Sequence, residues 1–202
     1  METNRVEPFQ PLDFDRLPRR AFLIMPFAFA GLVAVCSRKE RPLPDPAQSG
    51  SGPDITLVIF SNNGEHKGTV RVKKIVMTEV EWQRLLSSDE YAVTRRKGTE
   101  RAFTGRYWNN QEAGLYRCVC CGNALFRSQE KFEFGTGWPS FWAPIAQDNI
   151  RTVSDTSLFM ERVEVLCRKC DGHLGHVFDD GPPPTNQRYC INSAALRFVK
   201  QV

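Results

Sequence analysis

Two pairs of cysteines with CxxC spacing constrain this chain more than any other feature of its sequence. Cys118 and Cys121 form the first pair, Cys167 and Cys170 form the second, and 45 residues lie between the pairs. A turn with two intervening residues lets both thiolates face one ion, and two such turns complete the tetrahedral four-sulfur shell of a structural zinc. Two disulfides are the alternative in an oxidising compartment. The spacing predicts one Zn²⁺ per chain, which joins distant strands and has no open coordination position for chemistry.

The composition is that of a soluble globular protein and not of a disordered or multi-span membrane chain. Of the 202 residues, 41% are hydrophobic and 25% are charged, which suits one domain of ordinary size and a tail. The net charge is +4, and the basic residues form only short runs such as residues 95–97. We therefore expect no nucleic-acid partner, and we expect a monomer.

Residues 1–36 have the pattern of an export signal or membrane anchor. Adjacent arginines, Arg19 and Arg20, are followed by Ala-Phe-Leu and by an apolar run over 24–35 that is short for a membrane span. This arrangement resembles a twin-arginine signal, which is an address read by a receptor. Cys36 closes the run, and three outcomes stay open: lipidation, cleavage without lipid, or retention as an anchor. We expect an extracytoplasmic protein in the periplasm, with the cytoplasm as the alternative.

The remaining sequence divides into a linker, a hairpin and a domain. Residues 37–54 combine Pro, Gly, Ser and charge, which predicts a flexible linker. Two β-rich runs around a turn signal at 62–64 (Asn-Asn-Gly) predict a β-hairpin extension over 55–76. Residues 77–202 are then expected to form the main domain.

Within that domain the sequence predicts one short helix followed by β-structure. Thr78 and Glu81 form a capping box, which starts a helix that ends near Ser88. From about residue 100 onward, glycines, aromatics and short alternating runs replace any long 3.6-residue period. The expected fold class is mainly β, with zinc-stapled antiparallel β-sheets and a short N-terminal helix.

Cys120 lies inside the first CxxC pair and is either a metal ligand or a spare thiol; we favour the spare thiol, because a ligand there would require adjacent residues to bind together. Cys190 is the cysteine of the domain that then remains. A reactive cysteine acts as its thiolate, so cations and hydrogen-bond donors that lower its pKa favour reaction. Arg188 lies two residues before Cys190, on the same face if this segment is a strand. His173 and His176 lie upstream, and the glycine between them permits a bend that presents both rings to one pocket. This grouping predicts a nucleophilic thiol whose pKa the cationic groups lower.

Trp138 belongs to a rigid aromatic run over residues 135–142. Glycines flank Thr136, and a proline follows Trp138, so the backbone is restricted on both sides. This rigidity favours a tryptophan held at a surface as the wall of a site. A core aromatic of a Phe-rich domain is the alternative interpretation.

Together these motifs resemble the methionine-R-sulfoxide reductase (MsrB) family. The motifs agree with the family in order and spacing, the two CxxC pairs are in register with them, and the similarity spans about residues 77–198. The matching runs are residues 98–105 (Gly-Thr-Glu-Arg-Ala-Phe-Thr-Gly), 137–141 (Gly-Trp-Pro-Ser-Phe), 173–182 (His-Leu-Gly-His-Val-Phe-Asp-Asp-Gly-Pro) and 188–193 (Arg-Tyr-Cys-Ile-Asn-Ser). The resemblance implies an MsrB-like β fold and a catalytic domain over 77–202. The implied reaction is reduction of methionine-R-sulfoxide in proteins, peptides or the free amino acid, as repair of oxidative damage.

The resemblance also implies a catalytic role for three side chains. Cys190 would attack the sulfur of methionine sulfoxide and be left as a sulfenic acid, while methionine departs. Because sulfoxide oxygen leaves poorly until it is protonated, a general acid is needed. His176, with His173, would supply that proton.

Four further side chains would position the reactants in the same scheme. Asn192 and Arg188 would orient the histidines and the thiolate. Trp138, with Phe178 nearby, would pack on the ε-methyl group of the substrate. The implied partners are oxidised proteins or peptides and a thioredoxin-like or other thiol reductant.

One position departs from the family pattern. Thr136 stands where many members carry a cysteine that resolves the sulfenic acid as an intramolecular disulfide. Three routes of regeneration stay open: an external thiol, Cys120, or Cys36 on its tether. We expect direct reduction by an external dithiol protein or a small thiol.

Two other classes of protein remain as alternatives. A zinc-stapled β module that binds a protein or nucleic acid without catalysis explains the four cysteines, but it gives the His-His and Arg-Tyr-Cys runs no role. A thiol-disulfide oxidoreductase expects an exposed CxxC after a strand in a βαβ setting, and that pattern is missing from the sequence.

Overall fold

The computed structural model describes residues 50–156 and 162–201. These residues belong to one compact unit, Arg41–Val202. The predicted export signal, Cys36 and most of the predicted linker lie outside the described residues. No helix of the described part is long and apolar enough to cross a membrane.

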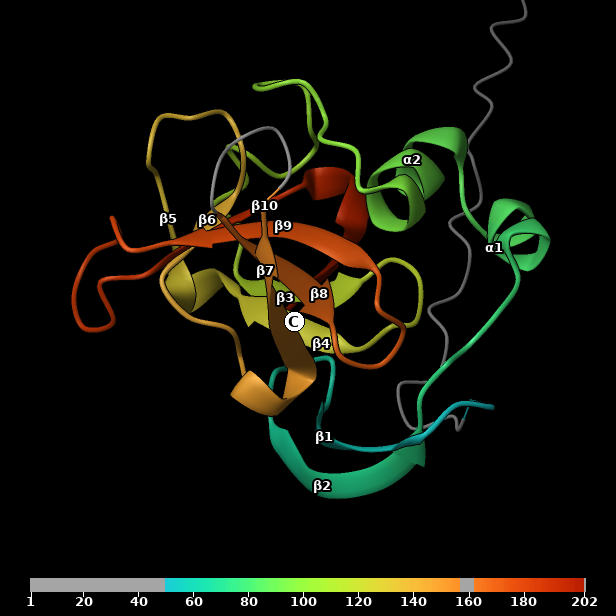
Figure 1. The fold of residues 1–202 in the computed structure, drawn as a ribbon. Helices are drawn as coiled ribbons and strands as arrows, with labels where there is room; N and C mark the ends of the chain where they lie inside the picture. The colour runs from blue at the N-terminus through green and yellow to red at the C-terminus, as the bar shows by residue number, and fades with distance from the viewer. Residues whose placement is uncertain (1–49, 157–161, 202) are drawn as a thin grey trace, which may run out of the picture. The chain divides into compact units, whose positions relative to one another are not determined.

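Three antiparallel sheets form the framework of this unit (Figure 1). A six-stranded sheet has the order β5-β6-β10-β9-β8-β7, a three-stranded sheet the order β11-β3-β4, and β1 and β2 pair with each other. The strands are β1 Asp54–Phe60, β2 His66–Lys73, β3 Gly114–Cys118, β4 Ala124–Arg127, β5 Lys131–Phe132, β6 Ser140–Phe141, β7 Ile150–Asp155, β8 Arg162–Cys167, β9 His173–Phe178, β10 Arg188–Ile191 and β11 Leu196–Lys200. Short 3₁₀ turns are η1 Ser128–Glu130, η2 Gln147–Asn149 and η4 Ser193–Ala195. The prediction of a mainly β, antiparallel fold is confirmed.

Two short helices precede the sheets of the domain. Helix α1 (Glu79–Leu85) begins at the predicted capping box, in which the Thr78 hydroxyl accepts the backbone N–H of Glu81. The helix expected to end near Ser88 already ends at Leu85, and a second capping box starts α2 (Ser88–Arg96). Helix α2 is not among the predicted elements because it is polar on most of its surface, which hides the helical period.

The core lies between the six-stranded and the three-stranded sheet. Tyr116 of β3 and Phe126 of β4 both contact Phe141 of β6, with ring centroids 5.1 Å and 4.5 Å apart. All three side chains are fully buried. Burial of an aromatic side chain of this size contributes roughly 2–3 kcal/mol, so this trio fixes the face of the large sheet that points away from solvent.

The hairpin β1–β2 packs against the domain through buried polar contacts as well as apolar ones. The Asn149 side-chain amide accepts the N–H of Val58 at 2.9 Å and donates to the Val58 carbonyl at 2.8 Å, as a neighbouring strand would. The guanidinium of Arg117 donates to the carbonyl of Phe60 at 2.8 Å. Leu57 is fully buried. The extension is therefore an integral part of this unit.

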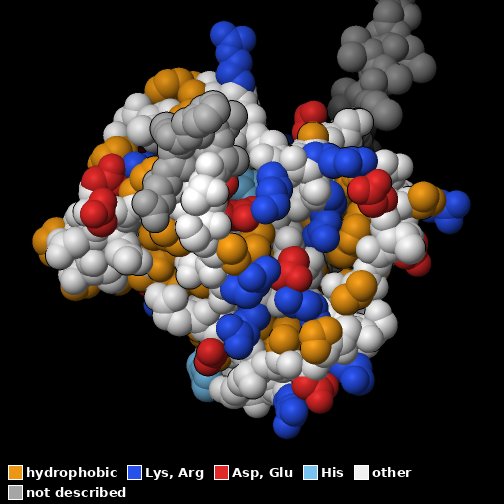
Figure 2. Space-filling view, viewed as in Figure 1, with side chains coloured by type: hydrophobic (Ala, Val, Ile, Leu, Met, Phe, Trp, Pro, Cys, Tyr) orange, Lys and Arg blue, Asp and Glu red, His pale blue; other side chains and the backbone are white. Residues whose placement is uncertain are grey.

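Charged side chains of the domain are largely paired across its surface. Figure 2 shows Lys and Arg side chains with Asp and Glu side chains among them on one face. Lys74, which follows the hairpin, and Arg151 of β7 both pair with Asp171, at 2.7 Å and 3.1 Å. Because Asp171 directly follows Cys170, the Lys74 pair links the end of the hairpin to the second cysteine turn, and the Arg151 pair links β7 to the same turn.

Candidate active site and metal centre

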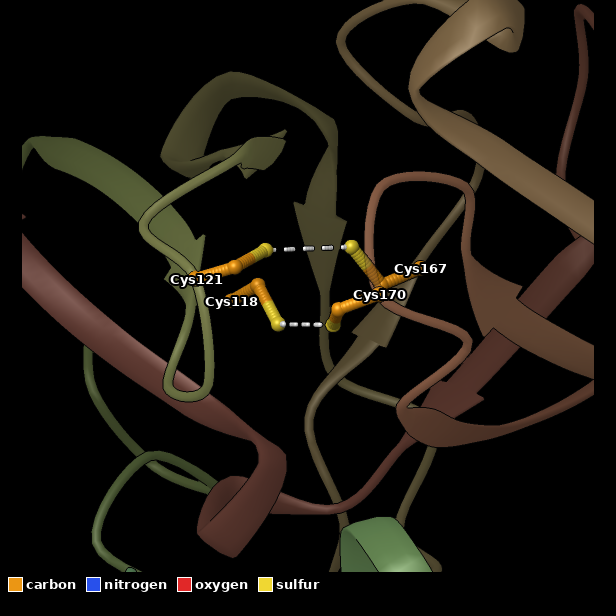
Figure 3. A group of neighbouring side chains, drawn as sticks. All are labelled: Cys118, Cys121, Cys167 and Cys170. Carbon is orange, nitrogen blue, oxygen red and sulfur yellow. Dashed lines mark hydrogen bonds between the residues drawn. The ribbon is translucent and has the colours of Figure 1, made fainter. Parts of the chain in front are cut away.

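The four CxxC cysteines converge on one point between the sheets (Figure 3). Cys118 ends β3 and Cys167 ends β8, while Cys121 and Cys170 lie in the turns that follow. Their sulfur atoms all lie within 4.8 Å of one another and are buried. The Cys118–Cys170 sulfurs are 3.7 Å apart and the Cys121–Cys167 sulfurs 3.6 Å apart. A tetrahedral zinc with Zn–S bonds of about 2.3 Å requires sulfur separations of about 3.8 Å.

The surroundings of the four sulfurs also fit a structural zinc. The side-chain amide of Asn123 donates to the Cys167 sulfur at 3.6 Å, and the Arg95 guanidinium donates to the Cys170 carbonyl. The two short sulfur separations join one turn to the other, whereas CxxC disulfides would close within each turn. These four cysteines are therefore the ligands of one structural zinc, as predicted, and the disulfide alternative does not match the geometry.

Cys120 lies against this metal site. Its side chain is only 5% exposed. A Cβ atom on Gly172 would lie 3.4 Å from both the Cys120 and the Cys170 sulfur, so Cys120 sits at the edge of the metal shell. It is a spare thiol beside the site, in agreement with the interpretation of the sequence.

Cys190 occupies the middle of the six-stranded sheet. In strand β10 it is paired with Ser140 of β6 on one side and with His176 of β9 on the other. Directly opposed residues of antiparallel strands project to the same face, so the thiol and the His176 ring are neighbours. The thiol is half-buried, which leaves it reachable from solvent.

A register shift brings His173 to the same region as His176. Residues three apart in a strand normally point to opposite faces, but the pairing of β8 with β9 is irregular between Val165 and Leu166. The two imidazole centroids are consequently 5.4 Å apart. Gly175 makes the shift feasible, because a Cβ atom there would lie 2.0 Å from the Cys190 carbonyl oxygen. The predicted bend that gathers both rings is present.

Each histidine is held by a carboxylate that the sequence analysis gave no role. His173 Nδ1 lies 2.7 Å from Glu164 Oε1, and His176 Nε2 lies 2.9 Å from Asp155 Oδ2. Each carboxylate has a cation of its own, since Lys97 Nζ lies 2.8 Å from Glu164 and Arg162 lies 2.9 Å from Asp155. These histidine–carboxylate pairs could not be predicted from residue types, because they depend on the register between neighbouring strands.

The buried histidine is held in its neutral form. Burial lowers the pKa of His173, and this effect outweighs the opposing hydrogen bond from Glu164. Burial has the opposite effect on the carboxyl group of Glu164 and raises its pKa. Hydrogen bonds from Lys97 and His173 outweigh this effect, so the pKa of Glu164 lies below its usual value. With Nδ1 facing a carboxylate, the proton of neutral His173 belongs on Nδ1. Its Nε2 is buried without a hydrogen-bond partner and is free to accept one.

Arg188 lies over the face of the sheet that carries Cys190. Its Nε and Nη2 each donate to a carboxylate oxygen of Asp180 at 2.8 Å. The guanidinium carbon lies 4.1 Å from the ring centroid of Phe134 and 4.3 Å from that of Phe178. The planar group is thus held by one ion pair and two rings, and its charge stays close to the thiol.

The charge of Arg188 lowers the pKa of Cys190, as expected, but the pKa of the thiol is nevertheless raised above its ordinary value. Burial raises the pKa of the Cys190 thiol, and this effect exceeds the lowering by the charge of Arg188. The Thr136 hydroxyl also favours the thiolate, although no hydrogen bond of standard geometry links the two groups. A half-buried sulfur loses more hydration than one nearby guanidinium, already paired with a carboxylate, can replace.

The side-chain hydrogen bonds of Asn192 go to the backbone and to neither histidine. Its side-chain amide donates to the Leu174 carbonyl at 3.0 Å, and its oxygen accepts the N–H of Glu100 at 3.0 Å. Leu174 follows His173 in β9, so Asn192 holds the backbone that carries the first imidazole. Asn192 can therefore orient His173 only indirectly, through the backbone of β9.

Glu100 links the tryptophan wall to the strand of the thiol. The Trp138 indole N–H donates to the Glu100 carbonyl at 3.0 Å. The Glu100 carboxylate accepts the backbone N–H groups of Ser193 and Ala194 at 2.6 Å and 2.9 Å, just after β10. Trp138 is half-buried. Glu100 lies in one of the quoted motifs, but its role required the three-dimensional contacts.

Comparison with known proteins decides the family. The SelR domain matches residues 86–200, which is more than half of the 202 residues. The chain belongs to the MsrB family. The "Peptide methionine sulfoxide reductase MsrB" of Hahella chejuensis is 58% identical over 125 residues, 62% of this chain and 90% of that protein. That of Methanosarcina mazei is 53% identical over 128 residues, 63% of this chain and 91% of that protein.

A plant relative is as similar in the matched region. The "Peptide methionine sulfoxide reductase B1, chloroplastic" of rice is 58% identical over 125 residues. The match covers 61% of this chain and 58% of the rice protein. The hairpin β1–β2 precedes the residues that the SelR domain match covers.

Loss of the metal is expected to unfold this MsrB domain. Structural zinc supplies on the order of 10 kcal/mol of folding free energy in small zinc domains, comparable to the roughly 5–15 kcal/mol stability of a whole domain. Cys170→Ser should therefore abolish the cooperative thermal transition and the bound zinc, measured by near-UV circular dichroism and elemental analysis. Cys120→Ser is the matched control and should keep one zinc per chain. A zinc-free Cys170→Ser protein with native near-UV signal would contradict the assignment.

The raised pKa of Cys190 is expected to appear in its alkylation by iodoacetamide. Only the thiolate reacts, so the rate should rise with pH around a midpoint above the ordinary cysteine pKa of about 8.5. Arg188→Met should move the midpoint higher still, because the guanidinium charge favours the thiolate. Arg71→Met, on the exposed face of the hairpin, should leave it unchanged. Peptide mass mapping assigns the label to Cys190, and a wild-type midpoint below that of free cysteine would refute the expectation.

Proposed function

We propose that this protein reduces methionine-R-sulfoxide residues to methionine, with Cys190 as the nucleophile. The observation that carries the proposal is the half-buried Cys190 thiol opposite His176 in the sheet, in a chain of the MsrB family. Oxidised proteins and peptides are the proposed substrates. Free methionine sulfoxide offers the same reacting group.

The first half-reaction transfers one oxygen from the substrate to the enzyme. The Cys190 sulfur attacks the sulfoxide sulfur to form an S–S bond, while the thiol proton is transferred to the sulfoxide oxygen. That oxygen then moves to the Cys190 sulfur as the S–S bond and the S–O bond of the substrate break, and methionine leaves. The oxygen ends on Cys190 as a sulfenic acid, so the thiol is oxidised by two electrons and the sulfoxide is reduced by two. His176 is the proposed proton donor. Neutral His173 presents an unpartnered Nε2 that accepts a hydrogen bond from the reacting groups.

The other site residues position the reactants. Trp138 is fixed through its indole N–H and offers its ring to the substrate methyl group. Phe178, whose ring lies against the Arg188 guanidinium, is the second proposed apolar contact. Arg188 favours the thiolate as the thiol proton departs, because its charge lowers the pKa of Cys190. Asn192 acts through the backbone of β9. In this scheme the zinc holds the fold and takes no part in the chemistry.

The separated R and S epimers of a methionine sulfoxide peptide test this function. With dithiothreitol as reductant, the wild-type protein should reduce the R epimer and leave the S epimer unchanged. Cys190→Ser should lose activity by at least about a thousandfold, because covalent catalysis has no other nucleophile there. Its thermal transition should match that of the wild type, which separates loss of chemistry from loss of fold. A folded Cys190→Ser protein with full activity would revive the alternative of a zinc-stapled binding module.

We also propose that an external thiol regenerates the sulfenic acid. Thr136, near Cys190, provides no second sulfur, and Cys120 is buried at the edge of the metal shell. Cys36 lies outside the described residues. Two thiols of a dithiol protein or small-molecule reductant would return Cys190 to the thiol and release water and a disulfide.

Intact-mass analysis distinguishes external from internal resolution. After stoichiometric methionine-R-sulfoxide without reductant, the full chain should gain the mass of one oxygen. Dimedone, which labels sulfenic acids, should then modify Cys190. Quantitative loss of two hydrogens would show an internal disulfide instead, and Cys120→Ser and Cys36→Ser variants would identify the partner.

We further propose that residues 1–36 export the protein to the periplasm, on the basis of the adjacent Arg19 and Arg20 before an apolar run. Residues 37–54 would then tether the catalytic domain, residues 77–202, and its hairpin. Replacing Arg19 and Arg20 with lysine should retain the protein in the cytoplasm on cell fractionation. Unchanged periplasmic recovery of the double variant would reject this route.

A further inference from the structure

Phe103 combines two features that packing alone does not require. Its backbone is left-handed, with φ of 63°, a conformation that aromatic residues rarely adopt. Its side chain is nevertheless 54% exposed. Local strain of this kind persists only where the surroundings impose it, and it concentrates at functional positions.

Contacts with Gly137 and Trp108 impose this conformation. The Phe103 N–H donates to the Gly137 carbonyl at 2.9 Å. A Cβ atom on Gly137 would lie 2.6 Å from the Phe103 nitrogen and 2.8 Å from its ring, so the ring rests directly on the glycine backbone. The Trp108 ring meets it edge to face, with centroids 5.3 Å apart. The ring is therefore fixed in position next to the residue that precedes Trp138.

A second exposed ring contacts another residue of the proposed site. Phe134 is 40% exposed and lies over the guanidinium of Arg188, two residues before the thiol. The other large hydrophobic side chains with comparable exposure in the described part of the chain are aliphatic: Val76, Val80, Leu85, Val153 and Val163. The two exposed phenylalanine rings of the described residues, Phe103 and Phe134, thus each contact the proposed substrate site or a residue next to it.

We propose that Phe103 docks an apolar side chain of an extended polypeptide, one or two residues from the oxidised methionine. The inference rests on the proposed function and adds the kind of sequence that the site prefers. Trp138 would hold the methyl group, and consecutive residues of an extended chain are spaced by about 3.3 Å. Because Phe103 packs on the residue adjacent to Trp138, it lies at the distance of a near neighbour of the methionine. The free amino acid has no side chain that reaches it.

The ratio of two specificity constants isolates this contact. For each protein, kcat/KM is measured on a Leu-Met(R-O)-Leu peptide and on a Ser-Met(R-O)-Ser peptide with blocked ends, and on free methionine-R-sulfoxide. Phe103→Asn removes the ring while asparagine tolerates the left-handed backbone. The wild-type preference for the Leu peptide over the Ser peptide should fall about tenfold, the scale expected when one apolar side chain loses its contact. Phe103→Tyr keeps the ring and should restore the preference.

Val80→Ala is the matched control, because Val80 is equally exposed but lies on α1. It should keep the wild-type ratio. An unchanged ratio in a folded, active Phe103→Asn protein would overturn the proposal and leave the ring as packing for Trp108. An equal loss on all three substrates, with a lowered melting temperature, would also overturn it. Absence of wild-type activity on every R-sulfoxide would instead reject the proposed function itself.

Discussion

The four-thiolate shell is the constraint on which the rest of the site depends, because its ligands come from two different sheets. Cys118 ends a strand of the three-stranded sheet, and Cys167 ends a strand of the six-stranded sheet. One ion therefore sets the distance between the two layers, and the aromatic core fills the space between them. The strand β10 that carries Cys190 belongs to the larger layer. The metal therefore takes no part in the reaction but holds the platform, the sheet that carries the reactive groups.

Within that platform the reactive groups are placed by strand register. Cys190 and His176 face each other because they are paired across β10 and β9, and the irregular pairing of β8 adds His173. The carboxylates of Glu164 in β8 and Asp155 in β7 then hold the two imidazoles by hydrogen bonds. A one-residue slip of β9 would turn these side chains to the opposite face. Gly175, pressed against the Cys190 carbonyl, is the residue that permits this register.

The sequence was sufficient for features that depend on local spacing. The CxxC pairs, the hairpin around 62–64 and the capping box at Thr78 needed only neighbouring residues, and the structure contains all three. Features that depend on distant contacts were not accessible. The pKa of Cys190 required the balance between burial and the Arg188 charge. Glu100 required contacts 92 to 94 residues away along the chain. Helix α2 was missed for a different reason. The sequence contains its capping box, Ser87 and Glu90, but its mostly polar surface hides the helical periodicity of apolar residues.

The way the hairpin docks has a consequence for shortened forms of the protein. A chain that begins at residue 86, where the SelR domain match starts, keeps every proposed catalytic side chain and every zinc ligand. It loses strand β1, whose Val58 backbone forms two hydrogen bonds with the Asn149 side chain. It also loses the Phe60 carbonyl, which accepts a hydrogen bond from Arg117. An amide and a guanidinium that are buried in the full protein would then face solvent over an uncovered apolar surface. The residues matched by the family model therefore leave out a part of the chain that covers buried polar groups of the catalytic domain.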